Sequence, residues 1–160
     1  NVDLKAFTET FYNKLTFSHL HDILETLIWL KKETEIWIEN TTLLIPSEND
    51  SPDEIMQLSN WIVENLVTNV PFHFRGFHPT FKMRNHAHTP SDTLKIARYI
   101  AMEEGCHYVY TGNIHDSTGQ TTYCPNCHEP IIIRDWHSVI DFKRKNGNCK
   151  NCGDKIAGVF

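Results

Sequence analysis

The chain has 160 residues, of which 40% are hydrophobic, 22% charged and 11% aromatic, and its formal net charge is −5. This length fits one domain, or one domain with a small appendage, and the composition excludes disordered, collagenous and coiled-coil proteins. A chain of this size buries roughly 70% of its unfolded surface, so it needs no disulfide framework. We expect a soluble, cytoplasmic protein without membrane contact, because no apolar run approaches the roughly 20 residues of a membrane span and no leader pattern is present.

Charge divides the chain into two parts. Residues 122–160 carry six basic and four acidic side chains, whereas residues 1–121 carry nine basic and sixteen acidic ones. We therefore treat 1–121 and 122–160 as two chemically different units. The segment Val2-Asp3-Leu4-Lys5 has the pattern of a strand end, which predicts that the sequence starts within a fold.

Apolar periodicity predicts strands that alternate with helices through the first unit. Residues 8–33 fit a short helix and a long one, with Ser18 as the cap of the second, and residues 36–45 fit a strand that is buried on both faces in its later part. Ser51 and Glu54 form a capping box that opens the next helix, which ends near residue 69.

The rest of this unit continues the alternation. We expect a strand over 70–77, a His-rich loop over 79–89, a helix opened at Thr89 by the same capping device, and a short strand over 108–110. Such an order predicts right-handed crossovers and a parallel sheet, either part of an α/β barrel or a doubly wound sheet.

Two pairs of cysteines form the strongest motif in the chain. Cys124 and Cys127 are separated by two residues, as are Cys149 and Cys152, and 21 residues lie between the pairs. Each pair can point two sulfurs at one ion, so together they predict a tetrahedral zinc site, with iron as the alternative metal and two disulfides as the alternative chemistry. Between them, residues 131–133 and 139–142 predict a hairpin that turns around 136–138, which completes a zinc ribbon.

Polar residues at predicted strand ends are the other candidates, because ligands of parallel α/β sheets sit beyond the carboxyl ends of the strands. Asp3 and Lys5 present an anion and a cation on one face, which suits a zwitterion and equally suits a surface ion pair. Parity places Phe72, Phe74, Gly76 and His78 on one face of the third strand and His73, Arg75 and Phe77 on the other, with His78 at the end of the strand.

Several other residues favour a structural interpretation. The histidines at 73, 78, 86 and 88 match no helix-face ligand pair, although a second metal site is conceivable. Cys106 fits a small buried hydrophobe. The aromatic residues Phe11, Tyr12, Trp29, Trp37 and Trp61 fit the core.

Five separated motifs together resemble a known family. They are VDLKAF at 2–7, TTLLIPSEND at 41–50, FHP at 77–79, YVYTGN at 108–113, and YCPNC at 123–127 with AGVF at 157–160. In this order they resemble the radical S-adenosylmethionine (SAM) enzyme of the AmmeMemoRadiSam system, which is similar to pyruvate formate-lyase activating enzymes. The resemblance implies a partial (β/α) radical SAM barrel with parallel strands, followed by a small C-terminal zinc ribbon.

The resemblance also implies roles for single residues. Asp3, Lys5 and His78 take the places of SAM-binding residues, and Thr41 stands where the activating enzymes use an arginine. The C-x3-C-x2-C loop that binds the 4Fe-4S cluster lies before the fourth barrel strand in the family, and the five cysteines here offer no such motif. The resemblance therefore implies that the cluster ligands lie outside this sequence, in an amino-terminal half of the barrel.

Two functions follow from these observations. The first is the carboxyl-terminal portion of a radical SAM enzyme that cleaves SAM reductively and produces a 5′-deoxyadenosyl radical for hydrogen abstraction from an unidentified small molecule or protein. The alternative is a zinc-ribbon binding module for protein or nucleic acid, with basic residues at 143–145 and 150. The net charge of −5 argues against a nucleic-acid partner, because a phosphate backbone would be repelled.

Overall fold

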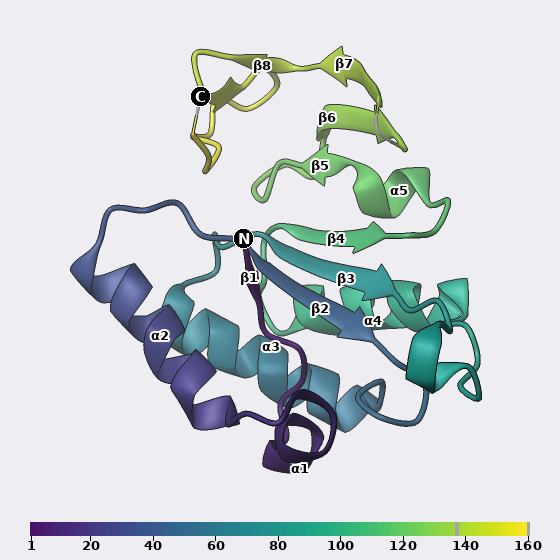
Figure 1. The fold of residues 1–160 in the computed structure, drawn as a ribbon. Helices are drawn as coiled ribbons and strands as arrows, with labels where there is room; N and C mark the ends of the chain where they lie inside the picture. Colours follow the sequence, from purple (N-terminus) through teal and green to yellow (C-terminus); the bar gives the residue numbers. More distant parts are fainter. Residues whose placement is uncertain (137, 160) are drawn as a thin grey trace.

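The computed structural model describes residues 1–136 and 138–159, without the side chains of Arg144 and Lys145. A four-stranded parallel sheet organises the first part of the chain, with its strands in sequence order (Figure 1). Its strands are β1 (Val2–Asp3), β2 (Asn40–Leu44), β3 (Phe72–Gly76) and β4 (Val109–Gly112). The intervening helices are α2 (Leu20–Glu33), α3 (Pro52–Leu66) and α4 (Ser91–Glu103). Among the described residues, no helix is long and apolar enough to cross a membrane.

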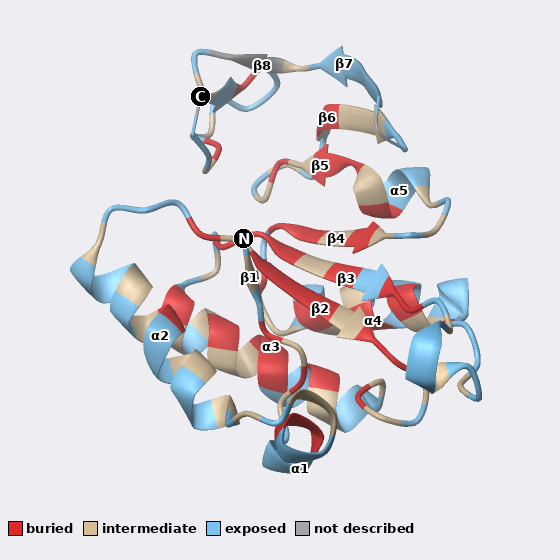
Figure 2. Ribbon diagram, in the orientation of Figure 1, coloured by how far each residue is buried: buried red, intermediate tan, exposed pale blue. Residues whose placement is uncertain are grey.

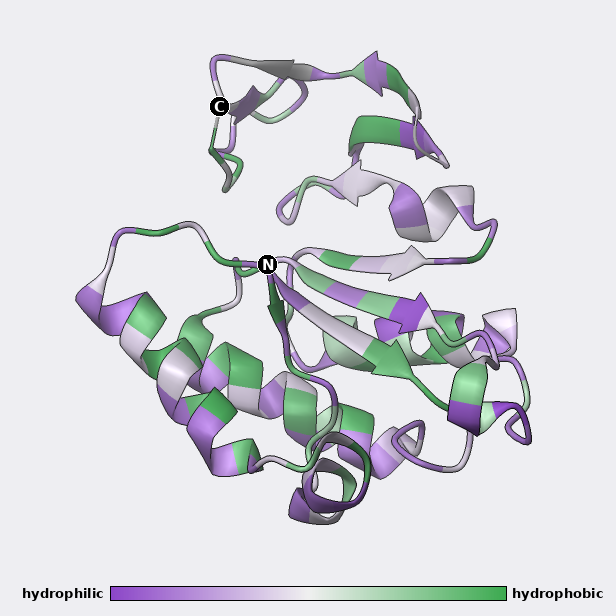
Figure 3. Ribbon diagram, viewed as in Figure 1, coloured by the Kyte–Doolittle hydropathy of each residue, from purple (hydrophilic) through white to green (hydrophobic). Residues whose placement is uncertain are grey.

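All three long helices pack against the same face of the sheet. The core cluster joins Leu44, Phe72, Phe74 and Val109 of the strands to buried residues such as Leu58 of α3 and others of α2 and α4. Alternating hydrophobic and hydrophilic bands along α2 and α3 reflect this one-sided burial (Figure 3). The predicted parallel sheet and the predicted parity of β3 are therefore confirmed.

The opposite face of the sheet carries polar and aromatic side chains, and we call it the open face. Strand register aligns Asp3, Thr41, His73 and Tyr110 in one row across the four strands. Arg75 lies in the next row, beside Gly112 of β4. None of these residues belongs to the helix-packed core cluster.

Short helical turns cover the carboxyl ends of the first three strands. They are α1 (Glu9–Phe11), a π-helical turn (Tyr12–Thr16) and a 3₁₀ turn (Phe81–Met83). Phe11 and Tyr12 pack on Ala6, Ile45 and Phe77, which directly follow or lie just beyond the strands. The prediction that these two aromatic residues are buried is confirmed.

The carboxyl-terminal part forms small antiparallel sheets beside β4. After α5 (Ser117–Gln120), a three-stranded sheet contains β5 (Thr122–Tyr123), β6 (Pro130–Asp135) and β7 (Ser138–Phe142). A two-stranded sheet contains β8 (Arg144–Lys145) and β9 (Asn148–Cys149). The hairpin arms are confirmed, whereas His137 within the predicted turn and Phe160 lie outside the described residues. Tyr108 joins the apolar cluster of this part, which anchors it to the parallel sheet.

Three local predictions are wrong, each because a distant partner replaces a local one. Glu54 accepts a hydrogen bond from Phe7 N–H at 2.7 Å instead of reaching back to the start of α3, although Ser51 does cap that helix. Glu9, not Ser18, accepts from the first amide of α2. Thr89 bonds the Phe77 amide and the Leu44 carbonyl, so it ties β2 to β3 instead of capping α4.

Two tryptophans also differ from the prediction. Trp29 is 55% exposed on the outer side of α2, and Trp37 is 38% exposed on the extended segment before β2. Both lie at the edge of the helix-packed core. Apolar periodicity predicts which side chains share a face, but it does not predict whether another element covers that face. Cys106 is buried as predicted.

Candidate functional site

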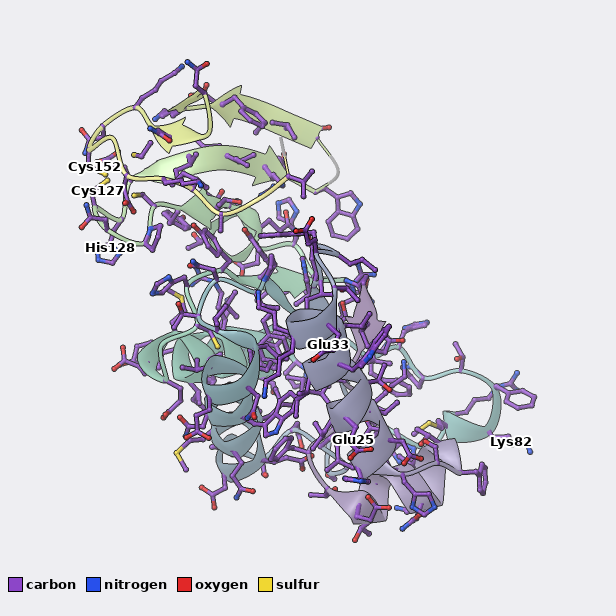
Figure 4. All side chains as sticks on the ribbon, turned by 90° about the vertical axis from the view of Figure 1, so that its left-hand side faces the viewer. Glu25, Glu33, Lys82, Cys127, His128 and Cys152 are labelled. Atoms are coloured by element: carbon purple, nitrogen blue, oxygen red, sulfur yellow. The ribbon has the colours of Figure 1, made fainter. Side chains whose placement is uncertain are left out.

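Four cysteine sulfurs converge at one end of the carboxyl-terminal part. The Sγ atoms of Cys124, Cys127, Cys149 and Cys152 all lie within 4.8 Å of one another. The distance is 3.6 Å between Cys124 and Cys152 and 3.8 Å between Cys127 and Cys149. Figure 4 shows Cys127 and Cys152 side by side, with His128 next to them.

Two similar turns position these thiols. The amide of His128 donates to the Cys124 carbonyl, and the amide of Gly153 donates to the Cys149 carbonyl, both at 2.9 Å. The amides of Cys124 and Cys149 in turn donate to the carbonyls of Glu129 and Asp154, five residues further along the chain. Both turns need a left-handed residue after the second cysteine, and this residue has φ 58° at His128 and φ 79° at Gly153. The histidine therefore occupies the position that favours glycine.

The thiol geometry fits a metal ion. Zinc bound to four thiolates at about 2.3 Å places sulfurs about 3.8 Å apart on the edges of a tetrahedron. The measured 3.6 and 3.8 Å match that edge and are far longer than a disulfide bond of about 2.05 Å. A hydrogen bond from the Asn151 side chain lowers the pKa of Cys127 to about 6, whereas burial raises the pKa of Cys124 to about 12. The case for a metal therefore rests on the sulfur geometry, and a bound cation would favour the thiolate form of both residues. The four cysteines could hold a metal ion such as zinc.

Asp3 and Lys5, the predicted zwitterion-binding pair, lie together at the outer strand of the sheet. Lys5 Nζ is 2.6 Å from Asp3 Oδ2, and the two side chains are 39% and 54% exposed. Thr41 is aligned with Asp3 on the neighbouring strand and is buried. The structure thus brings three of the four predicted SAM contacts onto adjacent strands of the open face, with the ion pair already formed.

His78 stands apart from these three residues. It follows β3 and is exposed, with its Nδ1 at 3.2 Å from Nδ1 of His88. His73 is level with Thr41, so His78 lies five residues further along the chain, at most about 17 Å at the rise of a strand. A ligand that touched both Asp3 and His78 would have to extend along the open face toward the carboxyl edge of the sheet.

The other histidines of the His-rich segment have separate partners. His73 pairs with Glu39 at 2.9 Å, and His86 pairs with Glu48 at 3.1 Å. Within the described residues, the four cysteines are the one group of three or more side chains that could hold a metal ion.

Asn49 is a buried polar residue whose role the sequence did not indicate. Its side-chain amide donates to the carbonyls of Lys5 at 2.6 Å and Leu43 at 3.0 Å, and its oxygen accepts from the Ile45 amide at 2.7 Å. It therefore fixes the backbone of Lys5 against β2. The sequence signal was an asparagine within the turn that follows a strand, which predicts only the turn itself.

Comparison with known proteins identifies a relative whose name assigns no function. The chain is 38% identical over 158 residues to the uncharacterized protein MJ0808 of Methanocaldococcus jannaschii. The match covers 98% of the chain and 47% of that protein, so the chain spans about half the length of the relative. No family model matches the sequence.

Proposed function

We propose that the chain is the carboxyl-terminal portion of a radical SAM enzyme, with Asp3, Lys5, Thr41 and His78 on the SAM side of the site. The observation that carries the proposal is the order of the strands together with the open face that the one-sided helices leave. Four parallel strands follow one another in sequence order with their helices on one side, and this is the arrangement of consecutive units of an α/β barrel, since a doubly wound sheet reverses its strand order.

The side chains on this face supply complementary charges for SAM. The Lys5 ammonium suits the carboxylate of the methionine end, and the Asp3 carboxylate suits its amino group. Asn49 holds the Lys5 carbonyl and so positions the Lys5 backbone. His78 follows β3, the next strand but one, at the carboxyl edge of the sheet, with its Nδ1 3.2 Å from Nδ1 of His88. When bound to its cluster in the whole enzyme, SAM supplies the 5′-deoxyadenosyl group as a hydrogen-abstracting radical.

In our proposal, the ligands of the 4Fe-4S cluster lie in a segment outside this sequence. The relative MJ0808 is about twice as long as the match, which leaves room for an amino-terminal half-barrel in a homologous protein. That half-barrel would add strands beside β1 and carry C-x3-C-x2-C. In the same proposal, zinc bound by the four cysteines is structural, because four protein ligands leave no open position on the ion.

SAM titration tests the proposal. We expect SAM to bind the longer protein with its cluster intact, and Lys5→Ala to weaken binding by about 1–3 kcal/mol, the range for a lost charge-assisted hydrogen bond. Lys95→Ala is the matched control, because Lys95 also forms an exposed ion pair, with Asp92 at 3.2 Å on α4. It should leave SAM affinity unchanged.

Thermal melts separate binding from folding. Lys5 is partly exposed, so Lys5→Ala should barely change the melting temperature without ligand. Unchanged SAM affinity together with a large fall in melting temperature would instead identify Lys5 as a structural partner of Asp3. The 160-residue chain alone should release no 5′-deoxyadenosine from SAM under reducing conditions, and turnover by it would contradict the proposed division of the site.

A further inference from the structure

A hollow of about 550 Å³ separates the open face of the sheet from the carboxyl-terminal part. This volume falls within the range of small-molecule sites, about 300–1,000 Å³. One wall comes from His73, Arg75 and Tyr110 of the sheet, and the other comes from Arg134 of β6 and the chain end near Val159. A smaller hollow of about 200 Å³ adjoins it and shares Arg75 and His73, so the space continues along β3 and β4.

The carboxylate of Glu39 in the hollow is already engaged in hydrogen bonds. Glu39 accepts from the Trp37 indole at 3.1 Å and pairs with His73 at 2.9 Å. The His73 hydrogen bond holds the pKa of Glu39 below its usual value, so this carboxylate stays ionised and occupied by its neighbours. The His73 ring stacks on Tyr110 with centroids 5.1 Å apart. These contacts join Trp37, Glu39, His73 and Tyr110 into one floor of the hollow.

Two arginines supply positive charge over this floor. The Arg134 guanidinium lies over the Tyr110 ring at 5.7 Å, and one of its nitrogens donates to Thr122 at 2.8 Å. Arg75 forms no ion pair with any described residue. Its stem lies against Gly112, where a Cβ would be 3.4 Å from Arg75 Cγ and 3.8 Å from Nε. The absence of a side chain at Gly112 leaves room for the Arg75 side chain beside β4.

We infer that this hollow binds a small anion with a flat ring, through a salt bridge from Arg75 to its acidic group and ring contacts with the aromatic side chains. An arginine without an anionic partner favours a carboxylate or phosphate, because its planar fork donates two parallel hydrogen bonds. Trp37, which lines the hollow and is 38% exposed, offers a face on which a flat ring stacks. Neither Asp3 nor Lys5 lines the hollow, so this inference stands apart from the proposed SAM contacts.

Calorimetric titration of the 160-residue, metal-loaded chain with indole-3-carboxylate and with 1-naphthyl phosphate tests the inference. Whichever acid binds more tightly identifies the anionic group. Arg75→Gln should weaken binding by about tenfold or more, the cost of a lost charge-assisted contact. Arg84→Gln is the matched control, because Arg84 is exposed and lies outside both hollows. The neutral isostere indole-3-carboxamide should bind the wild type about as weakly as the acid binds Arg75→Gln.

A second pair of variants tests the aromatic contact. Trp37→Leu should weaken binding, whereas Trp29→Leu, which changes an exposed tryptophan on α2, should leave it unchanged. Circular dichroism of each variant verifies that it is folded. Equal affinity of the wild type and Arg75→Gln, equal binding of the acid and the carboxamide, or no binding of either acid to the folded chain would overturn the inference.

Discussion

The helix-packed sheet and the four-cysteine part of the chain are stabilised by different interactions. Residues 1–112 hold a main core cluster of sixteen buried residues, drawn from three helices, the strands β2, β3 and β4, and the segments that connect them. The carboxyl-terminal cluster has six, and two of these belong to the four-cysteine group itself, Cys124 and Cys149. Every residue of β7 is exposed, whereas four of the five residues of β2 are buried (Figure 2).

This difference indicates which interactions stabilise each part. Apolar burial is sufficient for the helix-packed sheet, because each buried large side chain contributes roughly 1.5–3 kcal/mol. About 40 residues with so few buried apolar side chains cannot fold on burial alone and need an additional link. Four thiolates around one ion provide such a link, since the free energy of metal binding becomes free energy of folding.

Removing one thiolate should give the largest effect. We expect the wild-type chain to carry about one metal ion, and Cys127→Ser to lose it and to unfold residues 122–159, because metal binding to such sites contributes about 10–16 kcal/mol. Elemental analysis and hydrogen exchange measure these effects, and α3 and α4 should keep their helical signal. Cys106→Ala is the control, since this buried thiol is remote from the four and should leave metal content intact. A folded carboxyl-terminal part without zinc or iron would contradict the comparison.

The reciprocal change targets the apolar core. Phe74 is fully buried between the sheet and its helices, so Phe74→Ala should cost about 3–5 kcal/mol of unfolding free energy. Chemical denaturation followed by circular dichroism measures the loss, and metal content should not change. Tyr99→Ala on α4 removes a ring that is 63% exposed and should cost no more than about 0.5 kcal/mol. Equal costs for the two variants would show that the core does not stabilise this part.

The sequence predicted those features that depend on local pattern. Alternation along 72–77 predicted which side chains of β3 face the helices, and the spacing of the cysteines predicted their convergence. Both follow from a fixed repeat: two residues per strand period, and two residues between paired metal ligands. The proposed roles of Asp3, Lys5, Thr41 and His78 remain predictions.

Features that depend on distant partners were missed. Thr89 and Asn49 bind strand ends 40 or more residues away in sequence, at Leu44 and Lys5, and nothing in their local sequence identifies those carbonyls. Trp37 was assigned to the core because apolar spacing does not reveal that one face of the sheet stays open. The hollow between Arg75 and Arg134 likewise forms only after the carboxyl-terminal part packs beside β4.

The smallest expected effect concerns a single carboxyl within the apolar part. Burial raises the pKa of Glu54 above its ordinary value of 4.5, while the hydrogen bond from Phe7 N–H opposes that shift. Because the folded-state pKa lies above the unfolded one, Glu54 favours folding most below its unfolded pKa, and this contribution is lost as the pH rises through the folded pKa.

Glu54→Gln should therefore become progressively more stable relative to the wild type as the pH rises from about 4 to 7. Glutamine keeps an oxygen that accepts from Phe7 N–H and has no charge to desolvate, so the hydrogen bond is retained. The gain should stay below about 1 kcal/mol, since the carboxyl is only partly buried. Denaturation at each pH measures it, with Glu64→Gln on the exposed side of α3 as the control. A difference that is constant with pH, or that falls as the pH rises, would mean that the Phe7 hydrogen bond outweighs desolvation at this position.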